Sequence, residues 1–452
     1  MTRKWVVIGA LCLFTISPLL GQQRLSLQDC INIALEKNFS LQATRNTTNQ
    51  AENDVRGSLN YILPTVSTSA SGAKFTQGPE QTITQVQVTD SVTGQTRLIY
   101  RPTLTDKQSI NSYNFNFDVS QPLFDGGNMF YQMSKSRADR NAARFNLDNR
   151  TNETIRIVAQ YYIDLLKQEK LLEVNNLAMQ RSQDNLDKTQ KMFEIGSRAK
   201  VDVFRARVNY NNDRVSVLNQ ETTVKQARQT LNIALGNEPN APLEIEQDFN
   251  LDYTLQPLET LVDEALSAHP ELGRLEQTVV SRKKTVGISR SVFLPSVGGF
   301  FNYNRRNTQF DQVYGSLDQN WNTSVGVRVS MNLFNGFSDQ VNYQNARISE
   351  KNARLDLEEY KLNLRANIAR LYESYRNQLE VIQINRENVE ASREEYRLAN
   401  ERFRLGSGTS LDVRDAQVNL TDAERLMVAA EYDLILTYAA LREAVGDIQE
   451  AF

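Results

Sequence analysis

The chain has 452 residues, of which 40% are hydrophobic and 23% are charged, and its net charge is −3. This composition is ordinary for a folded protein, and the balanced charge excludes a broadly basic surface for nucleic acid. A mean hydropathy of −0.49 excludes a bundle of transmembrane helices, and two Cys with one His nearly exclude a structural zinc site or a disulfide framework.

The first residues have the pattern of a secretory signal peptide. Arg3 and Lys4 precede an apolar run of 16 residues, Trp5–Leu20, which is short for a spanning helix and usual for the core of a signal peptide. We therefore predict a signal peptide over residues 1–21, with a retained membrane anchor as the alternative. Its removal would leave Cys30 as the only cysteine, so we expect no internal disulfide.

The rest of the chain is an internal repeat. Residues 193–209 and 403–419 are identical at eight of 17 positions when offset by 210, and the same offset aligns 119–126 with 329–336. Self-similarity at a fixed offset is the signature of duplicated structural units. We therefore expect two similar halves in place of the three domains that length alone suggests.

The repeat sets the domain boundaries. We predict a first repeat at 22–236, a linker at 237–255 and a second repeat at 256–452. Upstream of the strands the offset grows from 210 to 231, so the first repeat has a longer loop. The polar, Gln- and Thr-rich stretch 77–108 is that insertion.

Each repeat is predicted to contain a helix, a β-hairpin, a long helix and a returning helix. Apolar residues recur every seven positions in the second repeat: Ile368, Tyr375, Ile382, Val389, Tyr396 and Phe403. A stripe of this period is a coiled-coil seam, and we assign its side chains to the core. The predicted long helices are 127–195 and 337–405, and the returning helices are 200–236 and 410–446. At 1.5 Å per residue each long helix would measure ~100 Å.

Strand patterns lie between these helices. Apolar and polar residues alternate at 113–121 and 325–331, which predicts hairpins at about 65–124 and 296–334 with one apolar face each. Asp125-Gly126 and Asn335-Gly336 end these hairpins, and their Asp and Asn are suited to capping the following helix. A soluble hairpin packed on helices is one interpretation.

The other interpretation is a share of a transmembrane β-barrel. Four strands cannot close a barrel, and an open strand edge is not tolerated in lipid. A membrane-spanning sheet would therefore require two, three or four copies of the chain, giving 8, 12 or 16 strands.

The duplicated tip motif resembles that of the TolC-like outer-membrane efflux proteins. It reads Phe-x-x-Gly-Ser-x-x-x-[Val/Leu]-Asp-Val-x-x-Ala and occurs at 193–206 and 403–416. The resemblance implies an α+β membrane protein in which a trimer shares a 12-stranded transmembrane β-barrel and a long α-helical coiled-coil barrel. It also implies location in the outer membrane with a periplasmic extension. The implied partners are a periplasmic adaptor, an inner-membrane pump and outer-membrane lipid, with no cofactor.

By this resemblance, acidic residues of the second tip form the pore constriction at a periplasmic gate. The matching residues are Asp412 and Asp415, which share a helix face. Crowded carboxylates attract cations. In the first tip the equivalent residues are Asp202 and Arg205, so only Asp202 keeps a negative charge. Helix capping is the alternative role for Asp202 and Asp412. Family members often carry a basic residue at the position of Gly408. Ion pairs that would hold the gate closed therefore lack a basic partner at this position.

The Gly-Ser tips have a second implied role. Gly196, Ser197, Gly406 and Ser407 correspond to the places where the adaptor's helical hairpin docks. A tight turn that needs Gly is the alternative, and both roles are compatible.

These features predict a passive exit duct for small molecules or a secreted polypeptide, gated at the tip. A non-conducting coiled-coil scaffold is the alternative. We predict no enzyme, because the chain lacks phosphate-loop and zinc-protease motifs. We expect the single His269, which precedes Pro270, to be an exposed helix-end residue without a role. The sequence does not identify the exported substrate.

Overall fold

The computed structural model describes residues 24–247, 255–315 and 317–451. The predicted signal peptide, 1–21, and residues 248–254 of the predicted linker lie outside the described residues. Internal contacts divide the chain into two compact units. Unit 1 falls within Met1–Thr48, Arg144–Arg274 and Leu357–Phe452, and unit 2 comprises Asn49–Ala143 and Leu275–Asp356.

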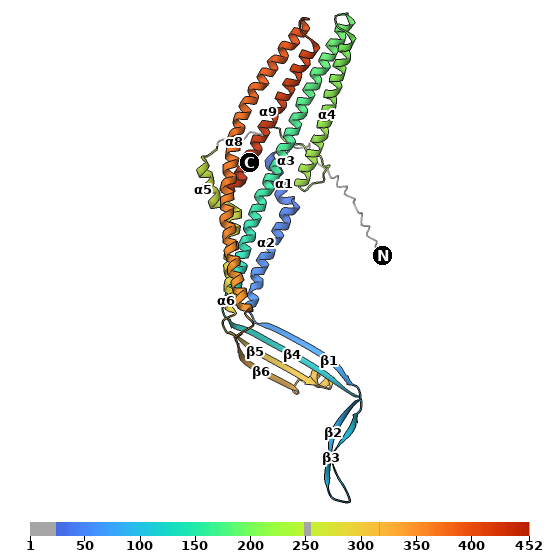
Figure 1. The fold of residues 1–452 in the computed structure, drawn as a ribbon, viewed down its shortest axis with the longest axis vertical. Coiled ribbons are helices and arrows are strands. Elements are labelled where there is room, and N and C mark those ends of the chain that lie inside the picture. Colours follow the sequence, from blue (N-terminus) through green and yellow to red (C-terminus); the bar gives the residue numbers. More distant parts are fainter. Residues whose placement is uncertain (1–23, 248–254, 316, 452) are drawn as a thin grey trace, which may run out of the picture. The chain divides into compact units, whose positions relative to one another are not determined.

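Each half of the chain supplies two short helices, one very long helix and one of intermediate length (Figure 1). In the first half these are α1 (Leu27–Lys37), α2 (Phe39–Gly57), α3 (Asn128–Glu194) and α4 (Lys200–Ala234). In the second half they are α5 (Leu258–Ala268), α6 (Pro270–Ser291), α8 (Ser338–Arg404) and α9 (Ser410–Val445). The other helical segments among the described residues are short: the turn η1 (Ser58–Tyr61), α7 (Phe310–Tyr314) and α10 (Ile448–Ala451).

The long helices α3 and α8 both contain 67 residues. Each passes from one unit into the other. The bounds expected from the sequence for the long and returning helices differ from the observed ones by at most two residues. Among the described residues, no helix has an apolar stretch long enough to cross a bilayer.

The helix before each set of strands is interrupted by a capping side chain. Asn38 separates α1 from α2, and its Oδ1 accepts a hydrogen bond from the N–H of Ser40 at 3.0 Å. His269 separates α5 from α6, and its Nδ1 accepts from the N–H of Glu271 at 3.1 Å. The expectation of an exposed His269 is wrong, because its ring packs against Tyr360 and is half-buried. Burial lowers the pKa of His269.

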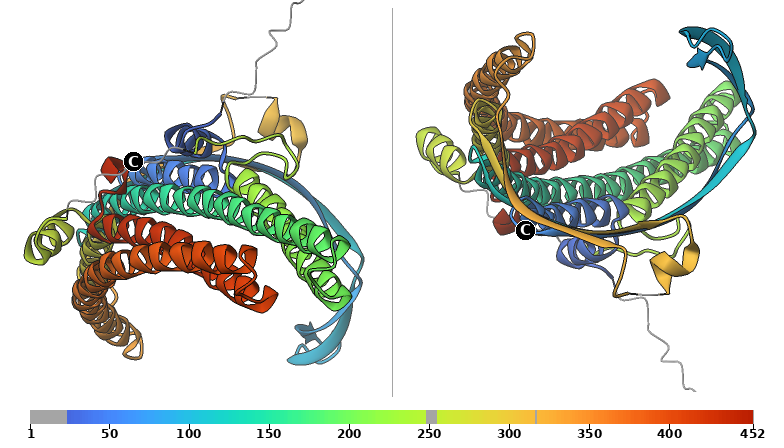
Figure 2. Two further views of the ribbon diagram at one scale, coloured as in Figure 1. Left: turned by 90° about the horizontal axis from the view of Figure 1, so that it is seen from above. Right: turned by 90° about the horizontal axis from the view of Figure 1, so that it is seen from below.

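The sheet of unit 2 has four antiparallel strands in the order β1-β4-β5-β6. They are β1 (Thr65–Gln77), β4 (Gln108–Asp125), β5 (Ser296–Asn307) and β6 (Trp321–Ser330). Ring contacts Phe115–Tyr303 and Phe117–Phe301 join β4 and β5 on the predicted apolar face. β1 and β6 are the edges and do not pair with each other, and Figure 2 shows the strands as a curved, open layer.

The two strand regions are more elaborate than simple hairpins. Within the predicted loop insertion 77–108, β2 (Glu80–Thr89) and β3 (Thr96–Thr105) form a separate two-stranded sheet. The expectation of a loop is wrong because Thr, Val and Ile favour strands, and the Asp90 carboxylate accepts from the N–H of Val92 to form the turn. In the second region a short helix, α7 (Phe310–Tyr314), stands between β5 and β6.

The heptad stripe lies in the core, as predicted, over most of its length. Val158 and Leu165 on α3, Leu231 on α4, Ile368 on α8 and Leu441 on α9 have no exposed side-chain surface. Coiled-coil packing of the two helical hairpins therefore builds the core of unit 1.

The junctions from strand to long helix use the predicted caps. The Asp125 carboxylate accepts from the N–H of Met129 at 2.8 Å, and Asn335 Oδ1 accepts from the N–H of Asp339 at 3.3 Å. The following glycine is left-handed in both repeats, with φ of 70° at Gly126 and 69° at Gly336. These contacts confirm the capping prediction.

We expect Gly126→Ala to destabilise the protein more than Gly336→Ala. Both variants place Ala in a left-handed backbone conformation, which should destabilise the folded state by roughly 1–2 kcal/mol. At Gly126 a Cβ would also lie 2.3 Å from the carbonyl oxygen of Ser291, whereas nothing lies within 4 Å at Gly336. That clash should add roughly 1–3 kcal/mol. Thermal unfolding followed by circular dichroism in detergent measures both variants, and equal midpoints would contradict the clash.

Candidate gate at the helical tips

Two tight turns join the long helices to the returning helices. At the first, φ of Gly196 is 74°, and the N–H of Ser197 donates to the carbonyl of Met192 at 2.8 Å. At the second, φ of Gly406 is 81°, and the N–H of Ser407 donates to the carbonyl of Arg402 at 2.9 Å. This is the Schellman arrangement, in which a left-handed Gly ends a helix. The predicted turn role of both Gly-Ser pairs is therefore confirmed.

The helix that follows the second turn has a complete capping box. The N–H of Asp412 donates to the hydroxyl of Thr409 at 3.1 Å, and the N–H of Thr409 donates to the Asp412 carboxylate at 2.9 Å. The hydrogen bond from the Thr409 N–H is the main cause that lowers the pKa of Asp412, and the Thr409 hydroxyl adds to it. Asp412 is therefore an exposed, ionised carboxylate fixed to the start of α9.

The first tip lacks this box. Ala199 occupies the cap position of α4 and makes no side-chain hydrogen bond, and Asp202 lies 3.7 Å from Arg205. Asp415 is exposed one turn beyond Asp412, and within the described residues it has no ion-pair partner. Within the described residues, the second tip thus presents two carboxylates without an ion-pair partner, whereas the carboxylate of the first tip is paired with Arg205.

We expect Thr409→Val to increase amide hydrogen exchange over residues 410–413 several-fold at neutral pH. The variant loses the cap and raises the pKa of Asp412 toward its ordinary value. Since the folded pKa is lowered, the contribution of Asp412 is present above the ordinary value of about 3.9. It is lost as the pH falls through the lower folded pKa, so the difference between the two proteins should narrow in acid to the part that comes from the neutral bond to the Thr409 hydroxyl.

Ala199→Thr is the converse variant, because it adds to the first tip the capping hydroxyl that Thr409→Val removes from the second. Asp202 already stands three residues later, so the new hydroxyl completes a box and should stabilise the start of α4 by roughly 1 kcal/mol. Unchanged exchange over residues 200–203 would contradict the capping argument.

One arginine crosses from the first tip to the second. Arg198 donates from Nη2 to the carbonyl oxygen of Gly408 at 3.1 Å, and its guanidinium lies 4.5 Å from the centre of the Phe403 ring. A cation therefore lies beside Gly408 although Gly408 itself supplies none. No local pattern in the sequence predicts this contact, because Arg198 belongs to the other repeat.

Polar contacts continue along α9 toward α3 and α4. Arg414 donates to both carboxylate oxygens of Asp213, at 2.8 and 3.1 Å, and Gln417 donates to Asp213 at 3.2 Å. Arg181 likewise donates to both oxygens of Glu424, at 3.0 and 2.8 Å. These side chains are mostly buried, so the pairs are weakly screened by solvent. They hold the second helical hairpin against the first.

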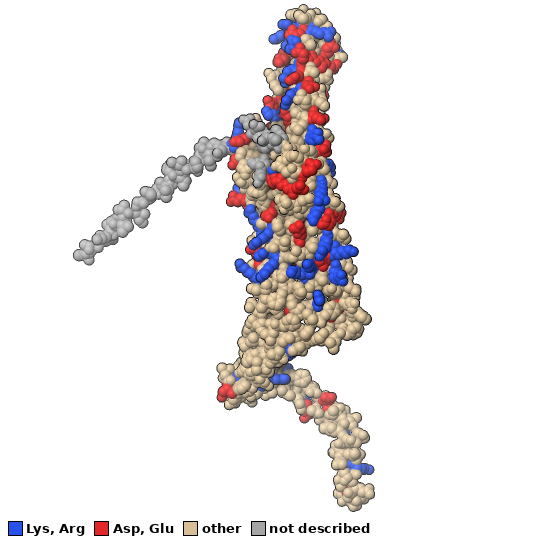
Figure 3. Space-filling view, turned by 90° about the vertical axis from the view of Figure 1, so that its left-hand side faces the viewer, with Lys and Arg blue, Asp and Glu red and all other residues tan. Residues whose placement is uncertain are grey.

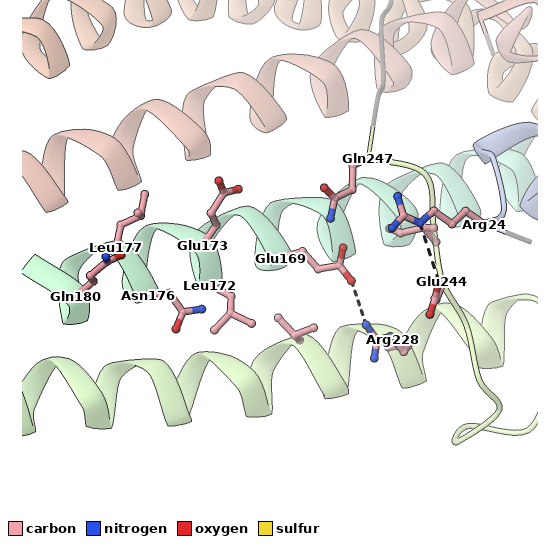
Figure 4. A pocket seen from close by; sticks show the side chains of 12 residues that line it. Arg24, Glu169, Leu172, Glu173, Asn176, Leu177, Gln180, Arg228, Glu244 and Gln247 are labelled. Carbon is pink, nitrogen blue, oxygen red and sulfur yellow. Dashed lines mark hydrogen bonds and ion pairs between the residues drawn. The ribbon is translucent and has the colours of Figure 1, made fainter. Parts of the chain in front are cut away.

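A groove on unit 1 is lined in part by paired charges. It has a volume of about 610 Å³ and lies along α3 and α4 (Figure 4). Its charges neutralise one another, since Arg228 lies 3.1 Å from Glu169 and Arg24 lies 4.0 Å from Glu244. Within the described residues no group of three His, Cys, Asp or Glu is placed to hold a metal ion.

Comparison with known sequences identifies a family and several curated relatives, among them AprF and TolC. A family model described as "Outer membrane efflux protein" matches residues 30–237 and 261–447. The chain is 23% identical over 249 residues to the alkaline protease secretion protein AprF of Pseudomonas aeruginosa, covering 53% of this chain and 50% of AprF. It is 23% identical over 298 residues to the outer membrane protein TolC of Vibrio cholerae, covering 65% of this chain and 67% of TolC. The match thus spans half the length of AprF.

Comparison with solved structures identifies the same fold. The outer membrane protein VceC of Vibrio cholerae superposes with a TM-score of 0.76 at 16% identity, covering 93% of this chain and 96% of VceC. The outer membrane channel CmeC of Campylobacter jejuni superposes with a TM-score of 0.77 at 17% identity, covering 93% of this chain and 85% of CmeC.

Proposed function

Because the chain belongs to the outer membrane efflux protein family, we propose that it forms the exit duct of a tripartite efflux pump or a type I secretion system. It is a protein of the outer membrane with a periplasmic helical extension. The duct carries small molecules or a secreted polypeptide outward and is passive, with energy supplied by an inner-membrane pump. The resemblance to AprF, which is described as a protease secretion protein, supports the polypeptide alternative.

A trimer with a 12-stranded barrel is the assembly we propose. The observation that supports closure is the open sheet, whose edge strands β1 and β6 have unpaired N–H and C=O groups. Such groups cost several kcal/mol each in lipid, so β6 of one copy would pair with β1 of the next. Val325, Val327 and Val329 on β6 are 79%, 65% and 66% exposed, as a lipid-facing strand requires. The number three comes from the resemblance.

Exposed seams on the helices also support an assembly. On α8 an apolar residue recurs every seventh position, and all are 49–63% exposed: Val341, Ile348, Leu355 and Leu362. On the first part of α4 the exposed apolar residues are Val201, Phe204, Val208, Val215 and Leu218. Seams of this period need a partner helix, and neighbouring copies in an α-helical barrel would supply it.

Two tandem repeats at 22–236 and 256–452, joined by 237–255, remain our proposal for the domain organisation. Its support is the equivalence of the capping residues Asn38 and His269, which are 231 positions apart, and of the two left-handed tip glycines.

The gate is proposed at the tips. In a trimer, Asp412 and Asp415 would place six carboxylates around the axis as a pore constriction, and Asp202 would be secondary. The contacts of Arg198, Arg414 and Arg181 would hold the gate closed, and their release would let the hairpins rotate apart. Gly196, Ser197, Gly406 and Ser407 would receive the periplasmic adaptor at the exposed tips.

Planar-bilayer recording on the purified oligomer tests the proposed function. We expect a cation-selective current, and a native mass corresponding to three copies. The open four-stranded sheet is the observation that carries the proposal. The alternative, a coiled-coil scaffold, requires an insulating assembly that stays soluble without detergent.

A further inference from the structure

Helices α3 and α6 carry cations at a common level near the sheet. The helices run antiparallel. A Cβ on Gly287 would lie 2.5 Å from the Tyr131 ring, and Asn141 Nδ2 lies 3.4 Å from Gln277 Oε1. Between these contacts lie six basic side chains. Arg140 donates to Asn141 Oδ1 at 2.9 Å, and we call the other five the basic cluster: Lys135, Arg137, Arg282, Lys283 and Lys284. The antiparallel register places Lys135 level with Lys283.

The charge of the basic cluster is largely uncompensated. Among its members, the described residues give an ion pair to Lys135 alone, with Asp139 at 2.6 Å. Within the part of the chain that the structure describes, no ion pair involves Arg137, Arg282 or Lys283, and all three are exposed. Figure 3 shows Lys and Arg gathered in a band across the face that contains α6 and α8.

A mainly apolar zone, with the exposed Arg290 in the last turn of α6 as a charged member, lies between the basic cluster and the strands. We call it the apolar collar, and its exposed members come from the strand–helix junctions of unit 2: Leu123, Phe130, Phe293, Leu294, Phe334 and Phe337. Figure 3 shows this zone as nearly free of charged atoms. Large exposed apolar side chains next to cations are the composition of a membrane interface.

We propose that the basic cluster binds the phosphate groups of anionic phospholipids in the periplasmic leaflet of the outer membrane. This rests on the proposed function, in which the sheet spans that membrane. Arg282 lies nine residues before the end of α6, ~13 Å from it. The headgroup layer is roughly 5–8 Å thick on each side of the hydrocarbon core. The long stems of Lys and Arg reach across the remaining distance, while the apolar collar fills the boundary.

The position of α6 in the unit favours lipid over a neighbouring copy. α6 leads into β5, and β5 is an internal strand with β4 on one side and β6 on the other. Sister copies would meet at the β1 and β6 edges. The basic cluster therefore stays uncovered in the assembly, and uncompensated cations attract anionic headgroups.

Native mass spectrometry of the detergent-purified oligomer, incubated with mixed micelles of phosphatidylglycerol and phosphatidylethanolamine, measures the preference. We expect the wild type to retain phosphatidylglycerol over phosphatidylethanolamine by roughly fivefold. The triple variant R282Q/K283Q/K284Q should retain the two lipids about equally, and high salt should have the same effect on the wild type.

The matched control is R207Q/R214Q/K225Q, which removes three exposed charges from α4 in unit 1. It should keep the preference, as should Arg282→Lys. A triple α6 variant that still prefers phosphatidylglycerol overturns the inference. So does one whose lipid preference is unchanged but whose ion selectivity shifts, because that assigns the cluster to the water-filled interior. Loss of current from every preparation would instead count against the proposed function.

Discussion

Replacing Asp412 and Asp415 together by Asn is expected to abolish the cation selectivity of the channel and to increase its current. Both carboxylates are exposed on the first turns of α9. Arranged around a narrow axis, such groups raise the local cation concentration by roughly tenfold or more. The same ring holds cations long enough to impede flow, so its removal frees the passage. Reversal potentials in a salt gradient measure the selectivity, and single-channel amplitude measures the current.

The single variants separate the two carboxylates. Asp412 also caps α9, whereas Asp415 has no such contact, so Asp415→Asn should lower selectivity without altering hydrogen exchange at the tip. The control pair is Asp184→Asn with Asp187→Asn, two exposed carboxylates three residues apart on α3. If selectivity persists in the Asp412/Asp415 double variant, the constriction lies elsewhere.

Arg414→Ala is expected to open the tips. It leaves Asp213, whose side chain is only 13% exposed, without its bidentate partner. Breaking a buried pair in this way costs roughly 3–5 kcal/mol, and the shift from closed toward open is then more than a hundredfold. The open state relieves that cost, because water then reaches Asp213. Higher open probability in bilayers and uptake of large hydrophilic antibiotics by cells are the expected readouts.

Two further variants serve as controls for Arg414→Ala: one exchanges the two charges of the pair, and one removes an exposed ion pair elsewhere. The variant with Arg414→Asp and Asp213→Arg restores opposite charges and should recover most of the closed state. Arg397→Ala removes an exposed pair within α8, since Arg397 and Glu394 are 59% and 56% exposed, and should leave gating unchanged. An Arg414→Ala channel with wild-type open probability would show that this contact does not hold the gate.

Local signals in the sequence were sufficient for the long helices. Gly196 and Gly406 mark the ends of α3 and α8, and Asp125-Gly126 and Asn335-Gly336 mark their starts, because a left-handed residue at these turns requires Gly. The heptad period then assigns the core positions. None of this depends on contacts between distant parts of the chain.

The features that sequence reasoning missed have two causes. Asn38 breaks a helix without Pro or Gly, so the interruption between α1 and α2 had no strong local signal. The contacts near the tips join residues far apart: Arg414 and Asp213 are 201 positions apart, and Arg198 and Gly408 are 210 apart. No periodicity links such partners, and charged residues are common on helices. Only the packing of one hairpin on the other pairs them.

The identical length of α3 and α8 restricts how such a protein can diverge. Deleting a single residue from either helix would turn every later side chain by about 100° and withdraw the tip by ~1.5 Å. The seam of that helix would then face away from its partner. Viable insertions and deletions must therefore come in whole heptads and must occur in both halves together. Natural variants of this architecture should accordingly differ in reach by discrete, paired steps of ~10 Å.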